Sequence, residues 1–470
     1  MNERPLAVLP ELLILAGAVV GLLLGLFLAR ERQWVVRLVT ASTLLAAILA
    51  SLIAASGLDG PVFDDSYTVD LVLTVARVVV CAATLLVLAL PGRGLVGHPR
   101  ETELYTLLLL AALGTIALAG AADLLLLVAA YLLASVPLYA LAGFAKDAAG
   151  TEAALKYYLM GAFLGVALLV GVALLYGAGG DTGYAALTES LPTAPRLAVG
   201  VGGLAVLAGL LFKLGGVPAH FWVPDVTEGA TTAVAAFVTT VPKVGAVLAA
   251  YRLVGGPLGD APGDWPLLVG ILAAASMTLG NLAAFFQDSV RRLLAYSTIS
   301  QVGYLLMAIA VAGRAELALP SLSLYVAAYA VTNVGAFAVV AAVQAGPQLQ
   351  DWRGVARRHP ALTVALLVCL LGLVGTPPTG VFVGKLTVFT ATAEGGLGWL
   401  VVLAAVNTVA SLFYYLRWIA PMFGATETPA NLPARTAAGS PAWPRRAAVL
   451  AAAISVGLGV AAGPLLDLFG

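Results

Sequence analysis

Apolar segments long enough to cross a lipid bilayer recur along this whole sequence. The hydrocarbon core of a bilayer is about 30 Å thick, so a membrane-spanning α-helix needs about 20 mostly apolar residues. Only 10% of the 470 residues are charged and 61% are hydrophobic, whereas soluble domains carry about 25% charged residues. The alternating segments of about ten residues that mark a β-barrel are missing from the sequence. We therefore predict an all-α polytopic membrane protein.

The apolar segments divide into about fourteen predicted spans. The turn between the fourth and the fifth span is marked only by the short sequence AGAAD. The predicted spans are residues 7–29, 34–56, 67–91, 105–121, 122–144, 154–178, 195–216, 230–254, 265–286, 292–313, 319–344, 360–391, 396–424 and 446–468.

Basic residues in the loops predict how the chain is oriented, because Lys and Arg are retained on the cytoplasmic side of a membrane. One side of the predicted bundle has only four, which are Arg4, Arg196, Arg252 and Arg314. The other side has fourteen, which are Arg30, Arg32, Arg37, Arg93, Arg100, Lys146, Arg291, Arg292, Arg353, Arg357, Arg358, Arg435, Arg445 and Arg446. The asymmetry predicts that the second side is cytoplasmic and that both termini lie on the opposite side.

Two interruptions of long apolar segments share the pattern L-x-G-x-P. They read LGGVP at 214–218 and LVGTP at 373–377, and they fall in the seventh and the twelfth predicted span. Spans that are an odd number apart cross the membrane in opposite directions, so the pattern predicts inverted repeats with discontinuous helices. We predict three N-terminal helices at 1–104, a first repeat at 105–254, a second repeat at 265–424 and a C-terminal helix at 446–470.

Four lysines lie within or at the ends of predicted spans, namely Lys156, Lys213, Lys243 and Lys385. An ammonium at bilayer depth costs at least about 2.5–3.5 kcal/mol, so such a lysine needs water, a partner or a lowered pKa. Desolvation moves a lysine from its usual pKa near 10.4 towards neutrality, which suits a group that takes up and releases protons. We expect Lys213, Lys243 and Lys385 to relay protons, because each lies near a Gly or Pro break that admits water. Lys156 starts its span and is equally compatible with the membrane interface.

Other polar residues have a second interpretation beside a functional one. His220 follows the first break, and it can continue a proton path or cap the broken helix. Asp225 and Glu228 are expected to cap the next helix. Arg77 and Arg417 are expected to reach lipid headgroups by snorkelling. The three histidines are far apart in sequence and both cysteines lie in apolar segments, so we expect no metal site and no disulfide.

Five segments resemble the antiporter-like membrane subunits of NADH-quinone oxidoreductase, respiratory complex I. They are FKLGGVPAHFWVPDVTEGATTAVAAFVTTVPK (212–243), KYYLMGAFLGVALLVGVALLYG (156–177), RRLLAYSTISQVGYLL (291–306), YAVTNVGAFAVV (329–340) and GTPPTGVFVGK (375–385). The similarity covers nearly the whole chain and favours the N-type branch. The L-type subunits carry a long lateral C-terminal helix, and the M-type subunits have a glutamate in place of Lys385. Mrp cation/proton antiporter subunits share the fold and remain the alternative.

The resemblance implies two inverted five-helix repeats and a central chain of lysines that passes protons. Lys213 would be the central lysine of the first half-channel, Lys243 the connecting group, Lys385 the lysine of the second half-channel and His220 a nearby relay. The chain would hold no cofactor, since NADH, FMN, iron–sulfur clusters and quinone would bind partner subunits. Its partners would be the M-, K- and J-type membrane subunits in a bacterial inner membrane.

The sequence departs from the family pattern at two positions. The family has a glutamate in the fifth span, in a segment similar to LGLELLSLPLY, and this chain reads VAAYLLASVPLY at 128–139. Alignment on Ser135 and Pro137 places Leu132 at the glutamate, and the family histidine in SIAHVGY is Gln301 here. Because Lys213 would lose the acid that pairs with it, a structural paralogue with impaired pumping is a further alternative.

Overall fold

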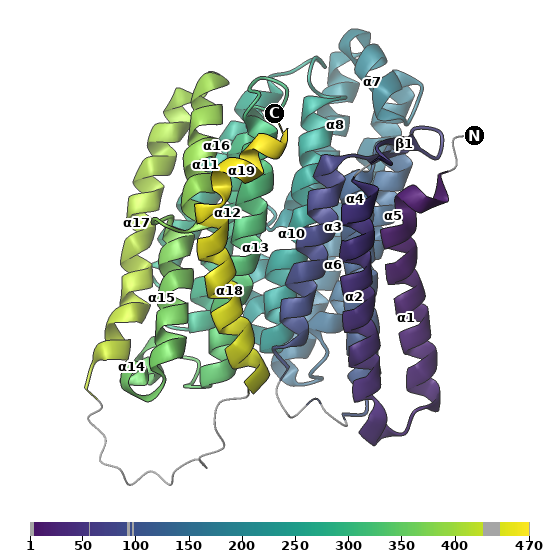
Figure 1. The fold of residues 1–470 in the computed structure, drawn as a ribbon. Helices are drawn as coiled ribbons and strands as arrows, with labels where there is room; N and C mark the ends of the chain where they lie inside the picture. The colour runs from purple at the N-terminus through teal and green to yellow at the C-terminus, as the bar shows by residue number, and fades with distance from the viewer. Residues whose placement is uncertain (1–3, 56, 92–94, 96–97, 426–441, 470) are drawn as a thin grey trace.

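The computed structural model describes residues 4–55, 57–91, 95, 98–425 and 442–469. These residues form a bundle of helices with one short antiparallel hairpin, β1 (Gly60–Val62) and β2 (Tyr67–Val69) (Figure 1). The α-helices are α1 (Leu9–Phe27), α2 (Trp34–Ala54), α3 (Leu71–Leu88), α4 (Glu101–Gly120), α5 (Leu124–Ala142), α6 (Ala148–Gly179), α7 (Tyr184–Ser190), α8 (Arg196–Leu214), α9 (Trp222–Gly229), α10 (Thr232–Gly255), α11 (Trp265–Ala284), α12 (Val290–Ala310), α13 (Ala318–Val343), α14 (Val355–Arg358), α15 (Pro360–Val374), α16 (Gly380–Glu394), α17 (Gly398–Phe423), α18 (Ala442–Val460) and α19 (Ala462–Leu466).

The predicted all-α polytopic membrane protein is confirmed. Twelve of the described helices are long and apolar enough to cross a membrane, and α18 with α19, bent by 77°, gives a thirteenth span. The predicted twelfth span is not one helix, because α15 and α16 are separated at the second Gly-Pro interruption. The weakly marked fourth and fifth spans are separate helices, since Asp123 caps α5 by accepting from the backbone N–H groups of Leu125 and Leu126.

The two ends of the bundle differ in the segments that they carry. Both chain termini lie at one end, together with the β-hairpin and α7, and α14 lies at the other end (Figure 1). The turn between α1 and α2, which carries Arg30 and Arg32, lies at the α14 end. Two of the basic loop residues counted in the sequence, Arg93 and Arg435, fall outside the described residues.

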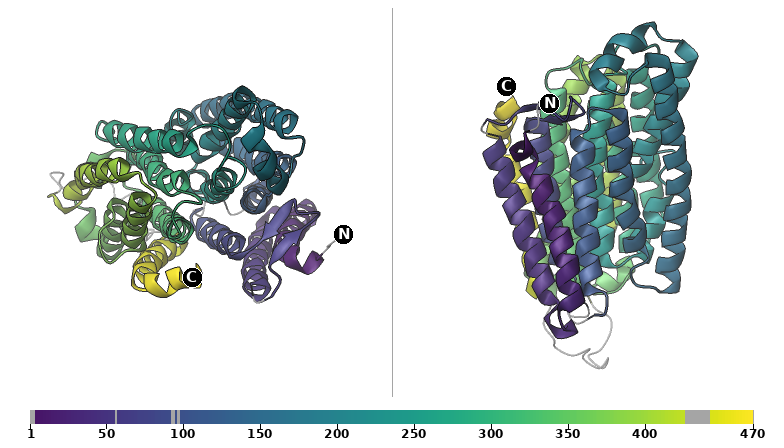
Figure 2. Two further views of the ribbon diagram at one scale, coloured as in Figure 1. Left: turned by 90° about the horizontal axis from the view of Figure 1, so that it is seen from above. Right: turned by 90° about the vertical axis from the view of Figure 1, so that its right-hand side faces the viewer.

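The most buried helices are α10, α12 and α13, which pack against one another in the centre of the bundle (Figure 2). The other long helices surround them and leave many large apolar side chains exposed at the surface of the bundle. Polar residues on these central helices therefore face other protein groups and not lipid, and this arrangement positions the candidate site.

Both predicted breaks are present and have the same local form. Helix α8 ends at Leu214 and is followed by Gly215 with φ 71°, and α15 ends at Val374 and is followed by Gly375 with φ 97°. A side chain at either position would be strained, because left-handed backbone is favourable only for glycine. Helix α8 starts near α7 and α15 starts near α14, so the two helices enter the bundle from opposite ends (Figure 1). The division of the chain into two inverted repeats stays a prediction.

The expected snorkelling of Arg77 is wrong, whereas Arg417 has protein partners but keeps 38% of its side chain exposed. The fully buried guanidinium of Arg77 donates to both carboxylate oxygens of Glu11, at 2.8 Å each, and to the carbonyl oxygen of Ala7. Arg417 donates to the carbonyl oxygen of Phe285 and forms an ion pair with Asp288 at 2.9 Å. Both guanidinium groups therefore bind protein carboxylates and carbonyls that are distant in the sequence.

The expected capping role of Asp225 and Glu228 is also wrong. Thr231 is the N-cap of α10 and accepts from the backbone N–H of Val234. Asp225 and Glu228 lie on α9, where both carboxylates pair with Arg292, at 3.4 Å and 3.2 Å. They therefore tie α9 to the start of α12.

Candidate functional site

A buried lysine closes the end of the broken helix α8. The side chain of Lys243 on α10 is completely buried, and its ammonium donates to the carbonyl oxygen of Leu214, the last residue of α8. The ammonium also lies 6.0 Å from the ring centroid of Trp222. A Cβ atom on Gly215 would lie 3.1 Å from this ammonium and 2.5 Å from a methyl group of Val223, so only glycine fits between the helix end and the lysine.

The second break contains the same arrangement. The ammonium of Lys385 on α16 donates to the carbonyl oxygens of Leu373 and Val374, at 3.2 Å and 2.9 Å. It lies 3.9 Å from the ring centroid of Tyr304. A Cβ atom on Gly375 would lie 3.0 Å from the Lys385 side chain. The carbonyl ends of two helices thus stabilise two buried cations, since a helix C-terminus carries partial negative charge. Lys243 corresponds to Lys385 in this respect, although the sequence had suggested Lys213.

Lys213 has a different partner. It lies on α8 with no exposed surface, donates to the hydroxyl of Ser135 on α5, and lies 5.0 Å from the ring centroid of Tyr131. The hydroxyl of Ser135 in turn donates to the carbonyl oxygen of Tyr131 at 2.6 Å, which leaves its lone pairs for the ammonium. Leu132 is 46% exposed on the outer face of α5. No described carboxylate forms an ion pair with any of these three buried lysines.

A line of polar side chains starts one helical turn from Lys243. Thr239 and Thr240 lie on α10, four and three residues before this lysine, respectively. The amide of Asn333 on α13 donates to the hydroxyl of Thr240 at 2.7 Å and to that of Thr239 at 3.2 Å. The hydroxyl of Tyr329, one turn earlier on α13, donates to the backbone carbonyl of Thr239 at 2.9 Å. The turn of α10 that precedes Lys243 is thereby hydrogen-bonded to α13.

The same line continues through α12 to the second break. The hydroxyls of Tyr329 and Thr298 are 3.1 Å apart, and Gln301 follows Thr298 by one turn on α12. The amide of Gln301 donates to the carbonyl oxygen of Leu373 at 2.7 Å. Lys385 donates to that same oxygen, so the polar line ends at the second buried lysine.

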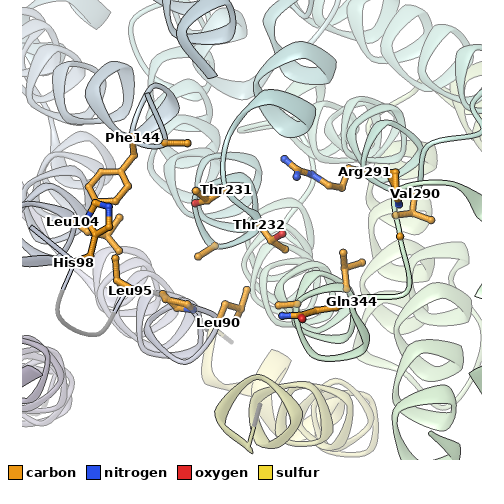
Figure 3. A pocket seen from close by; sticks show the side chains of 17 residues that line it. Leu90, Leu95, His98, Leu104, Phe144, Thr231, Thr232, Val290, Arg291 and Gln344 are labelled. Atoms are coloured by element: carbon orange, nitrogen blue, oxygen red, sulfur yellow. The ribbon is translucent and has the colours of Figure 1, made fainter. Parts of the chain in front are cut away.

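A cavity of about 540 Å³ lies where the central helices begin or end (Figure 3). It is lined by Thr231 and Thr232 at the start of α10, Arg291 at the start of α12 and Gln344 after α13. Thr232 precedes Thr239 by two helical turns, about 10 Å along α10. Figure 3 shows that the labelled polar side chains come from several elements around one opening.

Two of the residues expected at the site contact groups other than the buried lysines. His220 lies within the first break, its ring packs against Phe221, and its Nδ1 has no hydrogen-bond partner among the described residues. Lys156 is half exposed on α6 and forms ion pairs with Glu152 at 2.8 Å and Asp225 at 2.9 Å. It therefore joins the charged surface around α9.

Sequence reasoning missed the polar residues that link the lysines. Ser135, Thr239, Tyr329 and Asn333 are single polar residues within apolar helices, where such residues are common and have no distinctive spacing. The one available signal was their position inside spans that also carry lysine or a break. Within the part of the chain that the structure describes, no group of three or more His, Cys, Asp or Glu residues is placed to hold a metal ion.

A family model described as NADH:quinone oxidoreductase/Mrp antiporter, TM, matches residues 121–411, which include both breaks and all three buried lysines. The chain belongs to this family. Subunit N 1 of NADH-quinone oxidoreductase from Streptomyces griseus is 52% identical over 472 residues, covering 100% of this chain and 98% of the relative. Subunit N of NADH-quinone oxidoreductase from a Mycobacterium species is 50% identical over 465 residues, covering 99% of this chain and 98% of the relative. The resemblance to the N-type branch of the family is thereby confirmed.

Solved structures from the family have the same fold. Respiratory complex I from Thermus thermophilus with bound Aureothin contains a chain with a TM-score of 0.83 and 33% identity, and the match covers 98% of this chain and 99% of that chain. The Mrp complex from Dietzia contains a chain with a TM-score of 0.85 and 22% identity, and the match covers 99% of this chain and 96% of that chain. At 22% identity, the similarity to the Mrp chain shows a shared fold and nothing further. An antiporter-like fold is therefore common to both branches, and sequence identity favours the complex I branch.

Proposed function

We propose that this chain is a membrane-arm subunit of a proton-pumping NADH-quinone oxidoreductase and that it passes protons through Lys213, Lys243 and Lys385. The observation that supports a relay best is the paired geometry of the two breaks. In each, a buried ammonium donates to a carbonyl group at the end of an interrupted helix, and polar side chains lie between the two breaks, from Thr240 on α10 to Gln301 on α12. An ammonium held by neutral carbonyls can lose its proton without leaving a buried carboxylate unpaired.

Proton uptake is proposed at the α14 end of the bundle. The cavity lined by Thr231, Thr232, Arg291 and Gln344 lies at the start of α10, where it would supply water to the threonines below it. Basic loop residues predict that this end is cytoplasmic. On this orientation both termini lie on the non-cytoplasmic side of a bacterial inner membrane.

The electron-transfer chemistry is assigned to other subunits. NADH, FMN, iron–sulfur clusters and quinone would bind there, and this chain would couple to them through M-, K- and J-type membrane neighbours. His220 and Lys156 are kept as further relay candidates, His220 because it lies in the first break and Lys156 because it contacts α9.

The test is the proton stoichiometry of the assembled enzyme in membrane vesicles. Lys213→Met and Lys385→Met keep the length of each side chain and remove its charge, so we expect fewer protons pumped per NADH oxidised in each variant. Lys146→Met is the matched control, because Lys146 is exposed in the loop between α5 and α6 and lies away from both breaks. Unchanged stoichiometry in both buried-lysine variants would exclude the relay.

Two alternatives give different results in the same vesicles. An Mrp-type cation/proton antiporter subunit, favoured only by the shared fold, would support cation-driven proton movement without NADH. A structural paralogue with impaired pumping would tolerate Lys213→Met. Leu132→Glu separates this last case further, because a gain in pumping would mean that the missing acid is the defect. Leu132 faces outward, so the carboxylate introduced by Leu132→Glu would meet a neighbouring surface and not the Lys213 ammonium directly.

A further inference from the structure

Two arginines from distant parts of the chain converge on one tryptophan at the α14 end of the bundle, and a third arginine is adjacent in sequence. The guanidinium carbon of Arg446 lies 5.3 Å from the ring centroid of Trp443, and that of Arg37, on α2, lies 5.6 Å from the same centroid. Arg445 precedes Arg446 directly on α18 and is exposed. None of these three arginines forms an ion pair with a described carboxylate. The cluster therefore concentrates positive charge at this end of the bundle.

An apolar hollow of about 570 Å³ continues from this cluster along α18. Arg445 and Arg446 line one part of it, and Val449, Leu450 and Ala453 line the rest. Val449 and Leu450 are exposed although they lie in a membrane-spanning helix. From Arg446 to Ala453 the wall extends over seven residues, about 10 Å along the helix.

The helices on either side keep this face open. Helix α18 packs on α13 and α15, whereas α2 packs on α1 and α3. Figure 1 shows α18 and α2 on the same side of the bundle, and the view from above in Figure 2 shows them standing apart. The arginines at the end of the bundle suit a phosphate headgroup, and the apolar wall of α18 beside them suits an acyl chain.

We propose that this face binds one anionic phospholipid. Its phosphate lies between Arg37, Arg445 and Arg446, and an acyl chain follows Val449, Leu450 and Ala453. Basic pockets between membrane helices favour anionic headgroups, and an amphipathic tryptophan suits the headgroup level. The bound lipid connects the C-terminal helix to the N-terminal helices, which the contact between Trp443 and Arg37 also joins at this end.

The proposal is tested on the assembled complex in nanodiscs that contain phosphatidylcholine and phosphatidylglycerol. After re-extraction in mild detergent, mass spectrometry measures the phospholipid that remains bound. Each arginine near the headgroup contributes about fivefold to retention of an anionic lipid, so Arg445→Gln with Arg446→Gln should lower phosphatidylglycerol retention about thirtyfold. Arg445→Lys with Arg446→Lys should keep most of it, since the charge is retained.

The matched control removes two exposed cations from the same end, by Lys146→Gln with Arg353→Gln, and should leave retention unchanged. The proposal is overturned if phosphatidylcholine is retained as well as phosphatidylglycerol. It is also overturned if the Arg445→Gln and Arg446→Gln double variant retains as much phosphatidylglycerol as the unchanged protein. Displacement of the bound phosphatidylglycerol by millimolar glycerol phosphate also overturns the proposal, because the site would then bind a free phosphate. A photoreactive residue at Ala453 should capture phospholipid, and capture of a protein segment shows that another occupant covers the face.

Discussion

Gln301 is the residue at which the connection between the two breaks is most easily interrupted. Its amide donates to the carbonyl oxygen of Leu373 at 2.7 Å, and its amide oxygen accepts from the hydroxyl of Tyr325. Gln301→Leu removes both hydrogen bonds with little change in side-chain volume. Any effect on proton movement therefore reports on the polar line and not on a cavity.

The size of the effect follows from the groups that lose a partner. The Tyr325 hydroxyl is buried and is left unpaired, whereas the Leu373 carbonyl keeps its bond to Lys385. One unpaired buried polar group costs about 1–3 kcal/mol. If this cost adds to the barrier for proton transfer between the breaks, transfer slows by about fivefold to 150-fold.

The assay is proton uptake per NADH oxidised in membrane vesicles, with the amount of assembled complex measured in parallel. We expect Gln301→Leu to lower the proton stoichiometry at normal assembly and Gln301→His, which keeps a donor and an acceptor, to preserve it. Gln350→Leu makes the same chemical change at an exposed position and serves as the control. Full pumping by Gln301→Leu would refute the connection between the breaks.

Three further substitutions test contacts outside this connection. Arg77→Leu leaves the mostly buried Glu11 without its cation and should cost about 3–5 kcal/mol of stability in detergent unfolding. The added Glu11→Leu change should recover most of that cost, and a purely additive loss would contradict the ion pair. Ser135→Ala should cost about 1.5–3 kcal/mol by removing the acceptor of Lys213, with Ser135→Thr close to wild type. Asp123→Ala should destabilise α5 by about 0.5–2 kcal/mol, measured by faster hydrogen exchange in its first turn.

The spans and both breaks were predictable because their causes are local. A span is recognised by the length of its apolar segment, and a break by Gly and Pro within that segment, so LGGVP and LVGTP marked the ends of α8 and α15 correctly. The burial of Lys213, Lys243 and Lys385 followed from their positions in apolar surroundings. Their use in a relay stays a prediction.

The partners of the charges were not predictable in the same way. Arg77 was expected to reach lipid headgroups by snorkelling, yet Glu11, 66 residues earlier, pairs with it. Asp225 was assigned to a helix cap by its position in sequence, and it pairs with Arg292 and Lys156 from other helices. A long flexible cation can reach several groups, and only packing decides which of them is nearest.

The sequence by itself determined the class of the protein and the two places where a helix is interrupted. Hydrophobic length and the backbone chemistry of Gly and Pro act within one segment, so no knowledge of neighbouring helices was required. Only the tertiary structure decided that Lys213 meets Ser135, 78 residues earlier, and that Lys243 meets the carbonyl end of α8, 29 residues earlier. These contacts depend on how separate helices pack, because a buried ammonium must be satisfied by whichever polar atoms that packing brings within hydrogen-bonding distance.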